Sequence, residues 1–82
     1  MENLIFTLTT CKTSRKSTKI DIDTQVFPTL EAALSEMFDI KYRLIGNIKG
    51  KFQLMEDDKG NETTIFDNKM ITTIKVKQHE IL

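Results

Sequence analysis

One stretch of this chain, from Phe27 to Phe38, has the residue spacing of an amphipathic helix, and it limits how the rest can fold. Its apolar residues recur at intervals of three and four and form a single stripe, made of Leu30, Ala33, Leu34, Met37 and Phe38. Thr29 precedes the stripe and is suited to cap the helix with its hydroxyl. Because about three turns are too few for a helix to be stable alone in water, we expect it to pack on flanking strands, with Met37 and Phe38 in the core.

Two strands are predicted before the helix, at residues 3–10 and 19–26, because apolar and polar residues alternate there. We expect Leu4, Phe6 and Leu8 of the first strand to point into the core. Ile5, on the other face of this strand, suggests that this face is partly covered or lies at an interface.

The second strand has the clearest alternation. One side carries Ile20, Ile22 and Val26, and the other carries Lys19, Asp21, Asp23 and Gln25. Asp21 and Asp23 are two residues apart and therefore share a face, which we expect to be exposed. Such a pair suits either a bound cation or a solvated sheet surface near lysines.

Four further strands are predicted after the helix, at residues 40–48, 51–56, 62–66 and 70–78. Asp57–Asn61 lies between two of them and has the composition of a hairpin turn. It does not match an EF-hand calcium loop, because the ligand spacing is wrong and no helices flank it. The predicted order is ββ-α-ββββ, an α+β fold in which one helix packs on a mainly antiparallel sheet within a single domain, residues 1–82.

Composition narrows the function classes. Twelve basic and twelve acidic residues give a formal net charge of zero, so bulk attraction to nucleic acid or to an anionic membrane is not expected. No run of about 18 apolar residues predicts a membrane span. Met1–Leu4 includes an acid and no basic residue, unlike a signal peptide. A single cysteine permits no internal disulfide, which fits a cytoplasmic protein.

Patterns typical of enzymes and metal sites are absent from the sequence. One cysteine, Cys11, and one histidine, His79, cannot form a structural zinc site. A nucleophile pair of these two would need the end of the first strand to meet the end of the last. No phosphate-binding glycine motif occurs. We therefore predict a protein that is not an enzyme and holds no metal or cofactor.

The connection at residues 11–18 is basic and rich in hydroxyls. Lys12, Arg15, Lys16 and Lys19 bring four positive charges into eight residues, a composition that suits phosphate oxygens. Lys75 and Lys77 of the last strand would extend this surface if that strand pairs near the first. No aromatic residue is interleaved for base stacking. A solvated mobile loop, contact with phosphate and docking on an acidic protein surface all remain open.

We therefore predict a small non-enzymatic interaction protein that binds a protein partner, or itself as a homodimer, through a sheet face or edge. An excess of lysine over arginine, ten to two, favours an AT-rich genome and suggests an accessory protein of a bacterium, phage or mobile element that modulates a host protein. The alternative is a nucleic-acid-binding module using the segment from Lys12 to Lys19. The candidate partner- or phosphate-binding residues are Lys12, Arg15, Lys16, Lys19, Lys75 and Lys77.

Overall fold

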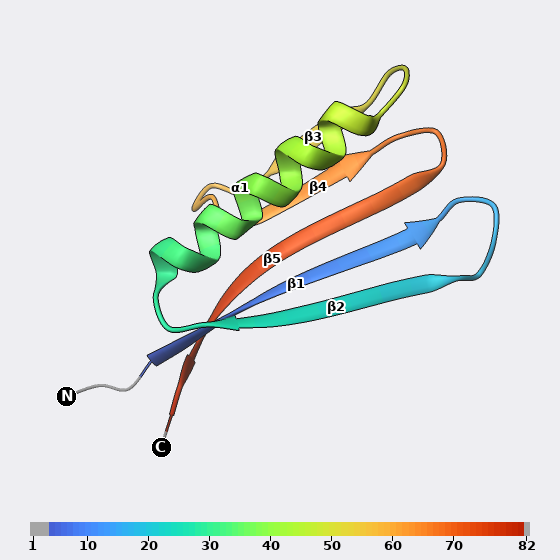
Figure 1. Ribbon diagram of the computed structural model, residues 1–82. Coiled ribbons are helices and arrows are strands. Elements are labelled where there is room, and N and C mark those ends of the chain that lie inside the picture. Colours follow the sequence, from blue (N-terminus) through green and yellow to red (C-terminus); the bar gives the residue numbers. More distant parts are fainter. Residues whose placement is uncertain (1–3, 82) are drawn as a thin grey trace.

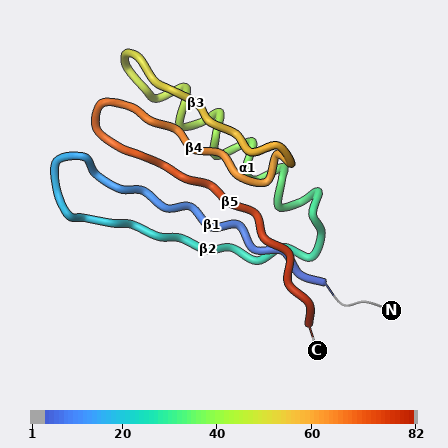
Figure 2. Tube along the Cα trace, turned by 180° about the vertical axis from the view of Figure 1, so that it is seen from behind, coloured from blue at the N-terminus to red at the C-terminus, as the bar shows by residue number. Residues whose placement is uncertain are grey.

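A five-stranded sheet with a helix on one face makes up the computed structural model, which describes residues 4–81 (Figure 1). The elements in chain order are β1 (Leu4–Ser14), β2 (Ile20–Phe27), α1 (Leu30–Asn47), β3 (Gln53–Glu56), β4 (Glu62–Phe66) and β5 (Met70–Glu80). Neighbouring strands are all antiparallel, in the order β2-β1-β5-β4-β3, which can be followed in Figure 2. The prediction of an α+β fold with one helix on an antiparallel sheet is confirmed.

Helix α1 is longer than the sequence pattern indicated. The strand predicted at residues 40–48 is wrong, because these residues continue the helix as far as Asn47 and leave three strands after it. Ile40 and Leu44 extend the apolar side of the helix and pack against the core. At the other end Thr29 caps the helix as predicted, since its Oγ1 accepts a hydrogen bond from the Ala32 N–H at 3.1 Å.

The core lies between α1 and the two central strands. Its buried members are Phe6, Leu8, Ala33, Met37, Ile74 and Val76. Leu4 packs against this cluster, so the inward side predicted for the first strand is confirmed. The prediction for Phe38 is wrong: its side chain is 45% exposed, because it lies beside the buried stripe rather than within it.

The strand ends differ from the predicted ones mainly at the first hairpin. Strand β1 continues to Ser14, so the polar connection predicted at residues 11–18 shrinks to residues 15–19. Asn3 lies outside the described residues. Pairing with both β2 and β5 supports this longer strand, because polar residues 11–14 gain backbone partners on two sides.

The hairpin turn predicted at residues 57–61 is confirmed. One oxygen of Asp57, Oδ1, accepts hydrogen bonds from the backbone N–H groups of Asn61 at 2.7 Å and Glu62 at 3.1 Å. Gly60 has a φ of 72°, a conformation that favours glycine. The turn joins β3 to β4, and β4 has the predicted bounds.

No helix among residues 4–81 combines the length and the apolar character needed to cross a lipid bilayer.

Candidate functional site

Strand β2 forms one edge of the sheet and exposes its apolar side chains. Phe27, at its end, packs against the core and pairs with Phe6, which fixes the odd-numbered residues on the side of α1. The even-numbered residues therefore lie on the face that α1 does not cover, which we call the open face. On this face Ile20, Ile22 and Val26 are 61%, 63% and 62% exposed.

Asp21 and Asp23 are exposed, as expected from the sequence, but they lie on the helix side of the sheet. The reason is that β2 extends beyond the part of the sheet that α1 covers, so neither of its sides is buried along most of its length. The alternation in β2 therefore places acids on one side and aliphatic side chains on the other, but most residues on both sides are exposed.

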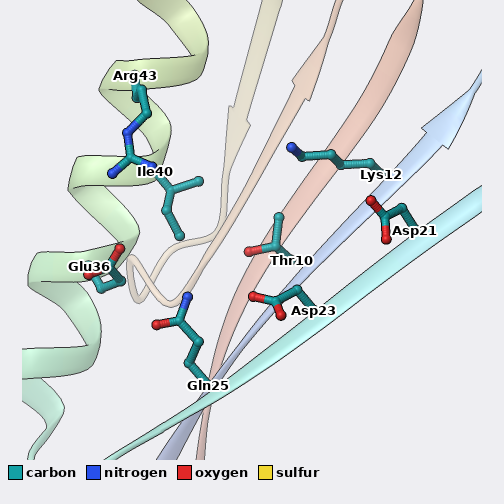
Figure 3. Close-up of a pocket in the computed structure, with 8 residues that line it drawn as sticks. All are labelled: Thr10, Lys12, Asp21, Asp23, Gln25, Glu36, Ile40 and Arg43. Carbon is teal, nitrogen blue, oxygen red and sulfur yellow. The ribbon is translucent and has the colours of Figure 1, made fainter.

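A polar groove lies between β2 and α1. Figure 3 shows Asp21, Asp23 and Gln25 on the strand side and Glu36 and Arg43 on the helix side. Lys12 and Thr10 of β1 and Ile40 of α1 complete the lining. Three carboxylates face two cationic groups, so the lining carries a small excess of negative charge.

Thr10 lies at the floor of this groove and is only 7% exposed. Its Oγ1 is buried and has no hydrogen-bond partner among the described residues. A buried hydroxyl without a partner loses its interaction with water and gains none in exchange.

The six cations predicted as binding residues do not form one surface. Lys12 belongs to β1 and lines the polar groove, whereas Arg15, Lys16 and Lys19 occupy the exposed β1–β2 loop. Lys75 and Lys77 are exposed on the open face, where they pair with Thr9 and Thr7. Five residues along β5 separate Lys75 from the loop end of the strand, about 17 Å.

Three connections instead lie at the same end of the molecule (Figures 1 and 2). The Arg15 N–H of the β1–β2 loop donates to the Lys69 carbonyl of the β4–β5 turn at 3.0 Å. Residues 48–52, which join α1 to β3, line two hollows with that turn. We call this surface the basic end and define it by Arg15, Lys16, Lys19, Lys49, Lys51 and Lys69.

Sequence reasoning missed three of these cations, Lys49, Lys51 and Lys69, because only the strand order brings them to the β1–β2 loop. It also missed Phe52, which is 41% exposed and lines one hollow with Arg15 and Lys51. No local signal in the sequence connects these residues with residues 15–19. These residues come together through the long-range pairing of β1 with β5.

Cys11 and His79 do not meet. Both lie on the open face, but Cys11 pairs with Thr73 and His79 pairs with Ile5, six positions further along β1. His79 Nε2 instead shares a hydrogen bond of 2.9 Å with Thr7 Oγ1. Within residues 4–81, no three His, Cys, Asp or Glu side chains converge in a manner suited to a metal ion.

Comparisons with models of protein families, with curated proteins and with solved structures found no match to this chain. The function is therefore argued from the surfaces described above.

Proposed function

We propose that this chain is a small non-enzymatic protein-binding module of the cytoplasm, and that it binds a strand of a partner protein along the free edge of β2. The observation that carries the proposal is the exposure of Ile20, Ile22 and Val26 at about the same level, 61–63%, along one side of an edge strand. Aliphatic side chains in such a row are suited to contact a second apolar surface.

The edge itself lacks several of the features that normally prevent pairing. Natural edge strands are often protected by charged side chains, proline, bulges or short length, and the charges on β2 are those of Asp21 and Asp23. Strand β2 has eight residues without lysine or proline, and it pairs with β1 in an uninterrupted register. The opposite edge, β3, has only four residues. Strand addition is therefore favoured at β2.

The two sides of β2 specify the chemistry of the added strand. On the helix side, exposed Asp21 and Asp23 favour lysine or arginine at alternate positions of the partner. On the open face, Ile20 and Ile22 favour β-branched apolar residues at the positions between. We therefore assign the occupant as a strand that alternates basic and apolar side chains.

Approximate free energies show why binding of a partner strand needs both the backbone of the β2 edge and its apolar side chains. Burying a whole valine or isoleucine side chain contributes about 1.5–3 kcal/mol, so three that are about 60% exposed offer roughly 3–5 kcal/mol. Loss of translational and rotational freedom on association opposes binding by about 4–15 kcal/mol. Apolar contact alone is too weak, and the backbone hydrogen bonds and ion pairs of strand addition must contribute.

The test uses a synthetic peptide that alternates lysine and valine, with a peptide of alternating glutamate and valine as comparison. We expect the lysine peptide to shift the backbone amide signals of β2 in NMR titrations and the glutamate peptide to leave them unchanged. Asp21→Asn combined with Asp23→Asn should weaken the lysine peptide's binding, because the opposing charge is removed.

A matched pair of variants tests whether the peptide binds at the β2 edge or at any exposed apolar side chain of the open face. Ile22→Lys places a charge on the open face at the β2 edge and should abolish peptide binding. Met55→Lys places the same charge on the same face in β3, at a residue exposed to a similar extent, 61% against 63%, and should leave binding intact. Equal loss in both variants, or concentration-dependent dimerisation through β2 without peptide binding, would contradict the proposed occupant.

A further inference from the structure

The basic end concentrates positive charge in a chain whose formal net charge is zero. Its three connections, residues 15–19, 48–52 and 67–69, contain six of the twelve lysines and arginines and a single carboxylate, Asp67. That carboxylate is engaged locally, because its Oδ1 accepts the backbone N–H groups of Lys69 at 2.7 Å and Met70 at 2.6 Å. Within these connections the excess of positive charge is therefore five, and the next carboxylate after Lys19 is Asp21 of β2.

An aromatic side chain accompanies these cations. Phe52 is 41% exposed and lines one hollow together with Arg15 and Lys51, beside Phe66 of β4. A second hollow, on the other side of the β4–β5 turn, is lined by Lys49 and Lys69. Asp67 and Asn68 line both hollows, so the two lie next to one another.

We propose that the basic end binds single-stranded nucleic acid, with Phe52 as a stacking surface for a base and the surrounding cations as contacts for phosphates. Proteins that bind single strands combine a positively charged path for the backbone with aromatic faces for the bases. The basic end supplies both, and the two hollows share Asp67 and Asn68 of the β4–β5 turn in their linings. This inference uses different residues from the proposed function and stands independently of it.

A duplex fits this surface less well. Sequence-specific duplex binding places a helix or a two-stranded ribbon in a groove. Here the cations come from three short connections, and the part of α1 at this end is its C-terminus, which carries partial negative charge. An acidic protein surface would satisfy the cations but would leave the exposed ring of Phe52 without a specific role.

The experiment measures fluorescence anisotropy of a labelled oligothymidine, with the corresponding duplex and polyglutamate as competitors. We expect binding that weakens as salt rises from about 50 to 200 mM, with a log–log slope of about 0.7 for each phosphate neutralised. Oligothymidine should bind more tightly than the duplex. Polyglutamate should compete poorly, since it offers charge without a stacking base.

Two matched comparisons assign the binding to the basic end. Lys16→Gln combined with Lys51→Gln should reduce the salt slope by about 1.4, whereas Lys75→Gln combined with Lys77→Gln, with the same net charge, should leave it unchanged. Phe52→Leu should weaken binding roughly fivefold or more, and Phe38→Leu, at a phenylalanine of similar exposure on α1, should not.

The proposal fails if oligothymidine does not bind at low salt, or if the two lysine variants lose affinity equally. Equal competition by polyglutamate, together with normal binding by Phe52→Leu, would reassign the basic end to an acidic protein. Tighter binding of the duplex would exclude the stacking role.

Discussion

Lys41 links the helix to the outermost strand of the sheet. It is 7% exposed, and its Nζ donates to Glu56 Oε1 of β3 at 2.7 Å. The same ammonium group lies 5.7 Å from the ring centre of Phe38 and 5.5 Å from that of Tyr42. Pairing with β4 holds β3 in the sheet, and this ion pair adds a link from the end of β3 to α1.

We predict that Glu56→Gln lowers the free energy of unfolding by about 1–2 kcal/mol, because it leaves the charge of Lys41 buried without its carboxylate. The value is at the low end of buried ion pairs, since Glu56 itself is partly exposed to water. Urea denaturation followed by circular dichroism measures the change. Asp58→Asn, an exposed carboxylate in the adjoining turn, is the control and should change stability little.

A double variant checks the cause. Lys41→Met in the Glu56→Gln background removes the unpaired charge and fills the same space with an apolar chain, so it should recover part of the lost stability. A further loss of stability in the double variant would show that the stem of Lys41 matters more than its charge.

Lys41 also explains why the sequence predicted too short a helix. It lies four residues after Met37, at a position where the apolar stripe should continue. A lysine there interrupts the pattern, and the neighbouring Ile40, Tyr42 and Gly46 resemble strand and turn residues. The ion pair with Glu56, which makes burial of this lysine acceptable, is a long-range contact that no local window reveals.

At the scale of an element, the stability of α1 depends on how its first turn is capped, because only one side of the helix packs against the core. Thr29 Oγ1 satisfies the Ala32 N–H, one of the backbone donors that a helix start leaves without partners. The cap is predicted correctly from the sequence, since capping depends on residues that are close together in the chain.

We predict that Thr29→Ala lowers the free energy of unfolding by about 1 kcal/mol. Ser35→Ala, an exposed position within the same helix, should raise it by a few tenths of a kcal/mol, because alanine favours the helix more than serine does. Thermal denaturation of the two variants should therefore shift the midpoint in opposite directions. Shifts of the same sign would contradict the assigned role of Thr29.

Strand β2 marks the limit of what alternation predicts. The alternation of Ile20, Asp21, Ile22 and Asp23 was evident in the sequence, and so was the shared face of the two acids. Phe27, at the end of β2, and the pairing of β2 with β1 determine which side of the strand faces α1. That β2 lies at an edge follows from the pairing of β1 with β5, whose paired residues range from Ser14 with Met70 to Leu4 with Glu80 and are far apart in the chain.

At the scale of the whole molecule, the zero net charge conceals an uneven distribution. A net charge of zero predicts that binding to polyanions would need a local patch, and the sequence indicates part of the basic end in Arg15, Lys16 and Lys19. The rest of the basic end comes from Lys49, Lys51 and Lys69, which the antiparallel meander and the long helix carry to the same end. By contrast, Lys75 and Lys77 pair with residues in the middle of β1 and lie elsewhere.

The molecule is long enough for its two ends to act separately. Its longest dimension is 47 Å, whereas the Debye length in 0.1 M salt is about 10 Å. Carboxylates distant from the basic end therefore cannot neutralise its field in solution. We predict that the protein binds a cation-exchange resin at pH 7.5 in about 0.1 M salt, although its sequence pI of about 6.6 would assign it to the flow-through.

Two variants of equal net charge make this prediction specific. Lys16→Gln with Lys51→Gln should elute at markedly lower salt than the wild type, because both changes weaken the basic end. Lys75→Gln with Lys77→Gln should elute close to the wild type, because the resin contacts the basic end and these two lysines lie on the open face. If both variants shifted equally, retention would depend on total charge, and the basic end would not act as a distinct surface.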